Sequence, residues 1–133
     1  MEFTKENLKL EDGRKKEWLI TNGMGGFASS TIIGANTRKY HGLLIAPLTP
    51  PAQRYLILSK VDESIKIEDV KYDLYTNIGE NYISQGYKYQ EKFEKDNFPV
   101  YTYKVNGTEI SKTICMEQGK EIVGIQYKIK KPY

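Results

Sequence analysis

The chain has 133 residues, of which 20 are Lys or Arg and 17 are Asp or Glu, so its net charge is only +3. This length predicts a single domain, and the near balance of charges argues against a nucleic-acid partner. The lone Cys115 and the lone His41 exclude an internal disulfide and a zinc cluster, so neither a metal nor a cofactor is expected. The polar start and the short apolar runs argue against a signal peptide and a membrane span, and we therefore expect a cytoplasmic protein without membrane contact.

Tyr and β-branched residues are frequent and helical stripes of apolar residues are not seen, which favours an all-β fold. Residues 1–16 are predicted to be a polar lead-in with a short helical turn, and residues 17–133 a single β-sandwich domain. Pro47, Pro50 and Pro51 are expected to end strand pairing. Strands are predicted, in chain order, at residues 18–21, 28–33, 40–46, 54–61, 64–68 and 70–75. The strand at residues 54–61 is expected to be central in its sheet, because it is partly a continuous apolar run.

The C-terminal third has the clearest pattern. Residues 77–89 contain several Gly and Asn and are predicted to form a long loop. Asn106-Gly107 then separates two alternating strands, and this dipeptide specifies a two-residue hairpin turn. About nine strands joined by short turns predict an antiparallel β-sandwich. The turn sets the register of the hairpin: Val105 lies opposite Thr108, Tyr103 opposite Ile110, and Tyr101 opposite Lys112.

The stretch from Glu17 to Leu44 concentrates the candidate functional residues. It holds the single Trp, the single His and five of the eleven Gly, and no Asp or Glu occurs from Trp18 to Val61. Part of its glycine-rich turn resembles a dinucleotide fingerprint, but a strand composition follows where that fingerprint needs a helix. The turn therefore supplies candidates for contact with a substrate or an adjoining domain: Asn22, Gly23, Gly25, Gly26 and Phe27.

A second motif in the same stretch is Arg38-Lys39-Tyr40-His41. At the start of a strand, alternation would direct Arg38 and Tyr40 to one face and Lys39 and His41 to the other. These side chains can be structural, with Arg38 bound to a carboxylate and His41 to a backbone carbonyl. The alternative is a polar rim for a sugar or for an adjoining domain.

No catalytic residue is expected in this chain. Glycoside hydrolysis needs two carboxylates beside the scissile bond, and the acid-free stretch has none. A triad of Ser29 or Ser30 with His41 lacks the pattern of a nucleophile elbow. Exposed aromatic side chains can instead stack on a sugar, and the candidates for this role lie in the long loop: Tyr82, Tyr87 and Tyr89.

The string EWLITNGMGGFASSTIIGANTRKYHGLLIAPLTPPAQRYLILSKVDE resembles the start of bacterial and archaeal glycogen debranching enzymes of the amylo-α-1,6-glucosidase type. The likeness continues in KYDLYTN, EKF and NFPVYTYKVNGTEISKTICMEQGKEIVGIQY, and it covers essentially Glu17 to Lys130. The glycine-rich string and the Thr-Arg-Lys-Tyr-His-Gly-Leu-Leu string together make the resemblance specific.

The resemblance implies a β-sandwich of the super-sandwich type, which precedes an (α/α)6 toroid that carries the catalytic carboxylates of a glycoside hydrolase. This chain is expected to lack the toroid and to be inactive alone. By similarity, it packs on the catalytic domain of the same polypeptide, and the loops 22–27 and 36–42 face that domain and the α-glucan substrate, glycogen or limit dextrin. Two other functions stay open: an autonomous glycan-binding module that uses exposed Tyr, and a single-stranded nucleic-acid binder.

Overall fold

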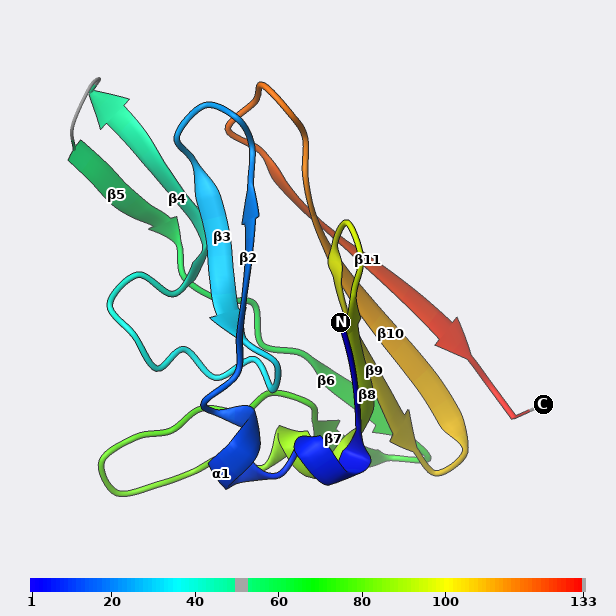
Figure 1. The fold of residues 1–133 in the computed structure, drawn as a ribbon. Coiled ribbons are helices and arrows are strands. Elements are labelled where there is room, and N and C mark those ends of the chain that lie inside the picture. Colours follow the sequence, from blue (N-terminus) through cyan, green and yellow to red (C-terminus); the bar gives the residue numbers. More distant parts are fainter. Residues whose placement is uncertain (50–52, 133) are drawn as a thin grey trace.

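A computed structural model describes residues 1–49 and 53–132, in which most of the regular structure is strand (Figure 1). The helical turns are η1 (Lys5–Asn7), α1 (Leu10–Gly13) and η2 (Gly86–Tyr89). The strands are β1 (Glu2–Thr4), β2 (Glu17–Thr21), β3 (Phe27–Thr31), β4 (Gly42–Thr49), β5 (Gln53–Leu58), β6 (Ser64–Ile67), β7 (Val70–Asp73), β8 (Gln90–Lys95), β9 (Pro99–Val105), β10 (Thr108–Met116) and β11 (Val123–Lys130).

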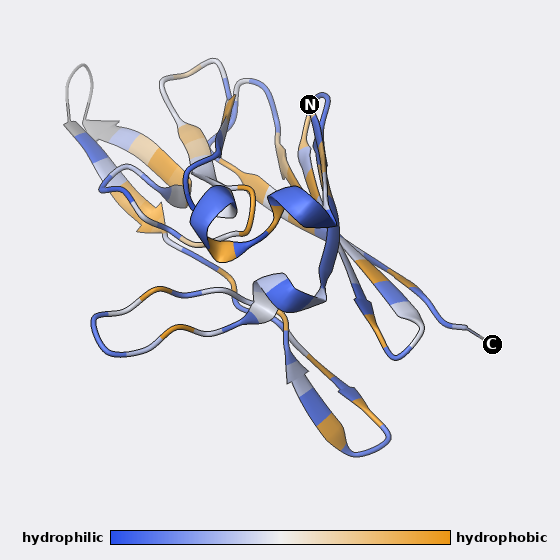
Figure 2. Ribbon diagram, turned by 60° about the horizontal axis from the view of Figure 1, so that its bottom comes forward, coloured by the Kyte–Doolittle hydropathy of each residue, from blue (hydrophilic) through white to orange (hydrophobic). Residues whose placement is uncertain are grey.

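Two antiparallel sheets form the layers of the fold. A five-stranded sheet has the order β1-β8-β9-β10-β11, a four-stranded sheet has the order β2-β3-β4-β5, and the hairpin β6–β7 is separate. Hydrophobic and hydrophilic segments alternate along the strands, as expected when one face of each sheet is buried (Figure 2). The predicted antiparallel β-sandwich is confirmed. No helix in the described part of the chain is long and apolar enough to cross a membrane.

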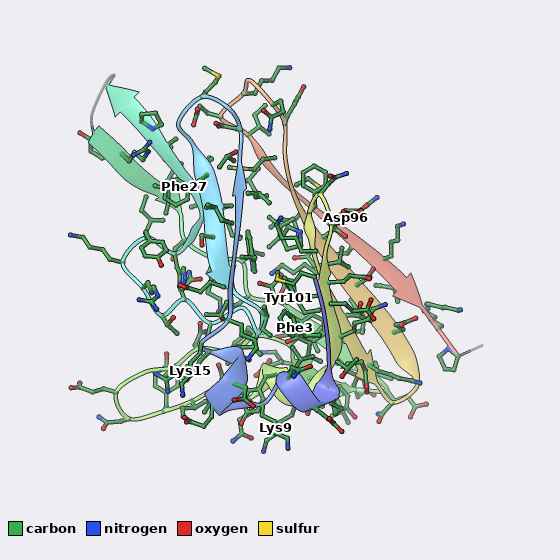
Figure 3. All side chains as sticks on the ribbon, viewed as in Figure 1. Phe3, Lys9, Lys15, Phe27, Asp96 and Tyr101 are labelled. Carbon is green, nitrogen blue, oxygen red and sulfur yellow. The ribbon has the colours of Figure 1, made fainter. Side chains whose placement is uncertain are left out.

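One hydrophobic core lies between the two sheets. Trp18 from the four-stranded sheet is buried with Phe93, Tyr101 and Ile114 from the five-stranded sheet. The indole Nε1 of Trp18 donates a hydrogen bond of 2.7 Å to the hydroxyl oxygen of Tyr101, which lies between the sheets in Figure 3. That hydroxyl in turn donates to the carbonyl oxygen of Thr31, also at 2.7 Å. The polar ends of both aromatic side chains are thus satisfied inside the core, as burial requires.

The predicted hairpin between β9 and β10 is confirmed residue by residue. Asn106 and Gly107 have φ angles of 48° and 81°, the positive values that a primed hairpin turn requires. The observed register places Val105 opposite Thr108, Tyr103 opposite Ile110 and Tyr101 opposite Lys112.

The strand predicted at residues 54–61 is central in no sheet. It is observed as β5, an edge strand, and its apolar residues Tyr55, Leu56 and Ile57 are exposed. The prediction that pairing ends at Pro47 is also wrong, because Pro47 lies opposite Arg54 between β4 and β5. The register shifts immediately after this pair, and such an irregularity accommodates a proline that cannot donate to the ladder. Pro50 and Pro51 lie outside the described residues.

Other elements differ from the sequence prediction at their ends. The strand expected at residues 28–33 already ends at Thr31, and the strand expected to include Tyr40 begins at Gly42. Two strands were not predicted: β8, and β1 within the polar lead-in, which pair with each other in the five-stranded sheet. Residues 77–89 form the expected long loop, with one isolated bridge and the short helix η2 at its end.

Candidate functional site

Asn22 organises the glycine-rich turn between β2 and β3. Its fully buried side chain accepts, through Oδ1, hydrogen bonds from the N–H groups of Met24 (2.8 Å) and Gly26 (3.0 Å). Its Nδ2 donates to the carbonyl of Lys120 and to a carboxylate oxygen of Glu121, both at 3.0 Å. Asn is well suited to such a turn because its side chain can satisfy the nearby backbone. Asn22 therefore attaches the turn to the connection between β10 and β11 in the opposite sheet.

The glycines of this turn are required by its geometry. Gly23 and Gly25 have φ angles of 79° and 88°, in the left-handed region that favours glycine. A Cβ atom on Gly26 would lie 2.5 Å from Nδ2 of Asn22. The glycine positions in the sequence thus specify the backbone conformation of this turn.

The second motif forms a turn that converges on Glu17, the first residue of β2. Oε1 of Glu17 lies 2.7 Å from Nε2 of His41 and 2.7 Å from Nε of Arg38, and it accepts a hydrogen bond of 3.1 Å from the Tyr40 hydroxyl. The expected alternation of these side chains is wrong, because they precede the strand and lie in a turn. Glu17 is not among the predicted site residues, although it is the last acidic residue before the long acid-free stretch.

The hydrogen bonds of His41 define its protonation state. Its Nδ1 accepts from the backbone N–H groups of Thr37 (2.9 Å) and Arg38 (3.1 Å), so the ring proton is on Nε2 and is donated to Glu17. Burial lowers the pKa of His41, and the neighbouring Glu17 carboxylate only partly offsets this effect. His41 is therefore neutral at neutral pH.

Glu17 is the charged member of this cluster. Burial raises the pKa of its carboxyl group, but the hydrogen bonds from His41 and Tyr40 and the charge of Arg38 outweigh burial and leave the pKa below its usual value. The carboxylate is ionised at neutral pH and cannot act as the general acid that glycoside hydrolysis requires.

A groove of about 570 Å³ extends along the outward face of β2 and brings the two motifs together. The glycine-rich turn forms one end, and Glu17 and Tyr40 form the other. Leu19 and Tyr40, which line the groove, expose 54% and 47% of their area. The groove is lined by Glu17, Trp18, Leu19, Thr21, Gly23, Gly25, Gly26, Phe27, Ser29, Tyr40 and Arg54.

Arg54 connects the neighbouring edge strand to the glycine-rich turn. Its Nε donates a hydrogen bond of 2.8 Å to the carbonyl oxygen of Gly25, and its guanidinium carbon lies 6.0 Å from the centre of the Phe27 ring. Figure 3 shows Phe27 on β3 at this end of the sheet. Glu17 is the one carboxylate among the described residues that line the groove. The groove thus presents a mainly apolar wall with a cation at one end and an anion at the other.

The model of the family described as glycogen debranching enzyme N terminal matches residues 16–132. The chain belongs to this family. The match includes both motifs and every strand from β2 to β11. Comparisons with curated proteins and with solved structures give no match.

Within this debranching-enzyme domain, the predicted site residues have different roles. Gly23, Gly25, Gly26, Phe27 and Tyr40 line the groove. Asn22 and His41 are buried supports, and Arg38 and Lys39 are exposed. The hydroxyl of Ser29 donates to the Trp18 carbonyl, and that of Ser30 donates to the Asn36 side chain. Neither ring nitrogen of His41 bonds to these serines, so no serine triad is formed.

The three loop tyrosines lie away from the groove. Figure 1 shows the long loop at the opposite end of the molecule from the glycine-rich turn. Tyr82 is exposed, whereas Tyr87 and Tyr89 are partly buried and pack against the core. Tyr89 also makes an edge-to-face contact with Tyr72, with ring centres 5.8 Å apart. Of the three, Tyr82 has the exposure that stacking on a sugar requires.

Proposed function

We propose that this domain packs, through the groove along β2, on the catalytic domain of a glycogen debranching enzyme with amylo-α-1,6-glucosidase activity, and that it performs no catalysis itself. The observation that carries the proposal is the exposed apolar wall formed by Leu19 and Tyr40, which line one groove. Scattered apolar residues are common on protein surfaces, but contiguous ones mark interaction surfaces. The glycine-rich turn and the Arg38–His41 turn hold the two ends of this wall in place.

The chemistry of the groove supports a role without catalysis. Hydrolysis of a glycosidic bond uses a protonated carboxylic acid and a second carboxylate on the other side of the bond. The groove offers Glu17 alone among its described residues, and three neighbouring groups already bind its oxygen. The catalytic carboxylates therefore belong to the partner domain of the same polypeptide.

Substrate access is the second part of the proposal. Arg38 and Lys39 are exposed beside the end of the groove that Tyr40 and Glu17 form. Their donors are suited to the hydroxyl groups of an α-glucan chain that approaches the boundary between the two domains. We propose that this boundary shapes the entry of glycogen or limit dextrin, and that the enzyme works in the cytoplasm.

The isolated chain allows a direct test against the other functions. We expect it to release no glucose from a branched limit dextrin and to bind glycogen no more tightly than a Tyr82→Ala variant does. Hydrolysis by the chain alone would contradict the proposal. Glycogen binding that is lost in Tyr82→Ala but kept in Tyr40→Ala would instead support an autonomous glycan-binding module, because Tyr82 lies outside the groove.

A further inference from the structure

A cavity of about 420 Å³ lies between β6 and the strands β9, β10 and β11 of the five-stranded sheet, and we refer to it as the β6 cavity. It shares no lining residue with the groove along β2. Figure 1 shows β6 toward the opposite end of the molecule from the glycine-rich turn. The volume is typical of small-molecule sites, in which apolar walls surround a few convergent polar groups.

The hydroxyl of Tyr103 is one polar group of this cavity. The Tyr103 side chain lines the cavity and is only 4% exposed, and none of the described residues makes a hydrogen bond to its hydroxyl. A buried tyrosine hydroxyl normally has such a partner, as the hydroxyl of the neighbouring Tyr101 has in Trp18 and Thr31. Burial raises the pKa of Tyr103 well above its usual value, and Tyr101 and Glu63 raise it further. The hydroxyl therefore keeps its proton and is available as a donor.

Glu63 supplies the second polar group. Its Oε2 lies 2.6 Å from Nζ of Lys112 and also accepts a hydrogen bond from the Tyr127 hydroxyl, whereas its Oε1 accepts none from the described part of the chain. The side chains of Glu63 and Lys112 are largely buried. Asp62, the other acid of the lining, is paired with Lys60 at 3.0 Å. The polar end of the cavity thus has balanced charges and offers one donor and one acceptor.

We propose that the β6 cavity binds a small uncharged molecule with a compact apolar body and one hydroxyl group. A hydroxyl group both accepts and donates, so it can bond to the Tyr103 hydroxyl and to Oε1 of Glu63. A charged ligand is disfavoured, because it would lose its hydration beside charges that already have partners. The apolar body matches aliphatic walls formed by Val61, Ile65, Leu74, Ile110 and Ile129.

The same walls disfavour a sugar. A sugar ring has a hydroxyl group on most of its carbons, and most of these would lie against aliphatic side chains without a partner, which costs free energy. The free donor and acceptor belong to Tyr103 and Glu63, which are largely buried, so a ligand reaches them only from inside the cavity. The site therefore differs from the α-glucan and domain contacts proposed for the groove along β2, and does not depend on them.

Phenol and toluene are matched probes, because they have the same ring and differ in a hydroxyl or a methyl group. In NMR titrations of the intact chain, phenol should shift the methyl signals of Ile65, Ile110 and Ile129, and toluene should bind about tenfold more weakly. Tyr103→Phe should weaken phenol binding about tenfold and leave toluene binding unchanged. Because no described residue bonds to this hydroxyl, the variant is expected to keep its fold and stability.

The control is Tyr89→Phe, which removes the hydroxyl of another partly buried tyrosine outside the cavity and should leave the binding of both probes unchanged. The proposal would be overturned if millimolar phenol did not bind, or if Tyr103→Phe bound phenol as tightly as the unmodified chain. Methyl shifts confined to Leu19 and the groove along β2 would refute the site. Displacement of phenol by maltose or by benzoate would refute the chemical class of the ligand.

Discussion

Removing the Glu17 carboxylate tests whether the second motif is held by its hydrogen bond to the buried His41 side chain. The Arg38 side chain is 56% exposed, and surface ion pairs of this kind contribute at most about 1 kcal/mol. The His41 side chain is 0% exposed, so without the carboxylate its Nε2–H is left buried and unpaired, at a cost of about 1–3 kcal/mol. We therefore expect Glu17→Ala to lower the free energy of unfolding by about 2–3 kcal/mol, and Glu17→Gln, which keeps an acceptor oxygen, by about 1 kcal/mol.

Urea unfolding followed by Trp18 fluorescence measures this effect, because the buried indole reports on the contact between the sheets. The matched control is Glu94→Ala, which removes a carboxylate from a surface pair with Lys92. The control should change the free energy of unfolding by less than about 0.5 kcal/mol. If Glu17→Ala is as stable as this control, the hydrogen bond to His41 does not hold the turn.

Three further changes follow from the same geometry. Because burial holds the folded-state pKa of His41 below its unfolded value, protonation favours the unfolded chain, and stability should fall as the pH drops below about 6.5. Urea unfolding at several pH values checks this, and an equal slope in His41→Asn would contradict it. Asn22→Ala leaves two N–H groups of the glycine-rich turn without an acceptor and should cost about 2–3 kcal/mol in urea unfolding, whereas a change below about 0.5 kcal/mol would show that the turn does not need it. Gly25→Ala, at a φ of 88°, should cost about 1–2 kcal/mol. Its control, Gly124→Ala, places a Cβ in open space and should be nearly neutral; equal losses in the two variants would show that the positive φ is not the cause.

The β9–β10 hairpin could be predicted to the residue because local signals agree there. The Asn106-Gly107 turn and the alternation of apolar residues specify the same register, so no distant contact is needed to choose it. The edge position of β5 could not be predicted in this way. Its apolar run is typical of a buried strand, but burial depends on which strands lie beside it, and that is set by the whole topology.

The candidate site could also be predicted only in part from the sequence. The glycine-rich turn and the Arg38–His41 turn were both identified as motifs, because their residue types are conformationally or chemically demanding. The sequence could not show that both turns border the same groove, because this depends on how β2 places them in the folded chain. Glu17 was missed because its three bonding partners lie more than twenty positions further along the chain.

Binding of the catalytic domain by the groove along β2 can be measured as the affinity of this chain for a separately produced (α/α)6 catalytic domain of a glycogen debranching enzyme. The decisive variant is Leu19→Lys, which places a charge on the apolar wall, and the control is Ile129→Lys, a similarly exposed apolar position on the other sheet. We predict that Leu19→Lys weakens binding by tenfold or more, about 1.4 kcal/mol, and that Ile129→Lys leaves it unchanged. Binding that is absent, or equally strong in the unmodified chain and in Leu19→Lys, would show that the groove does not bind the catalytic domain.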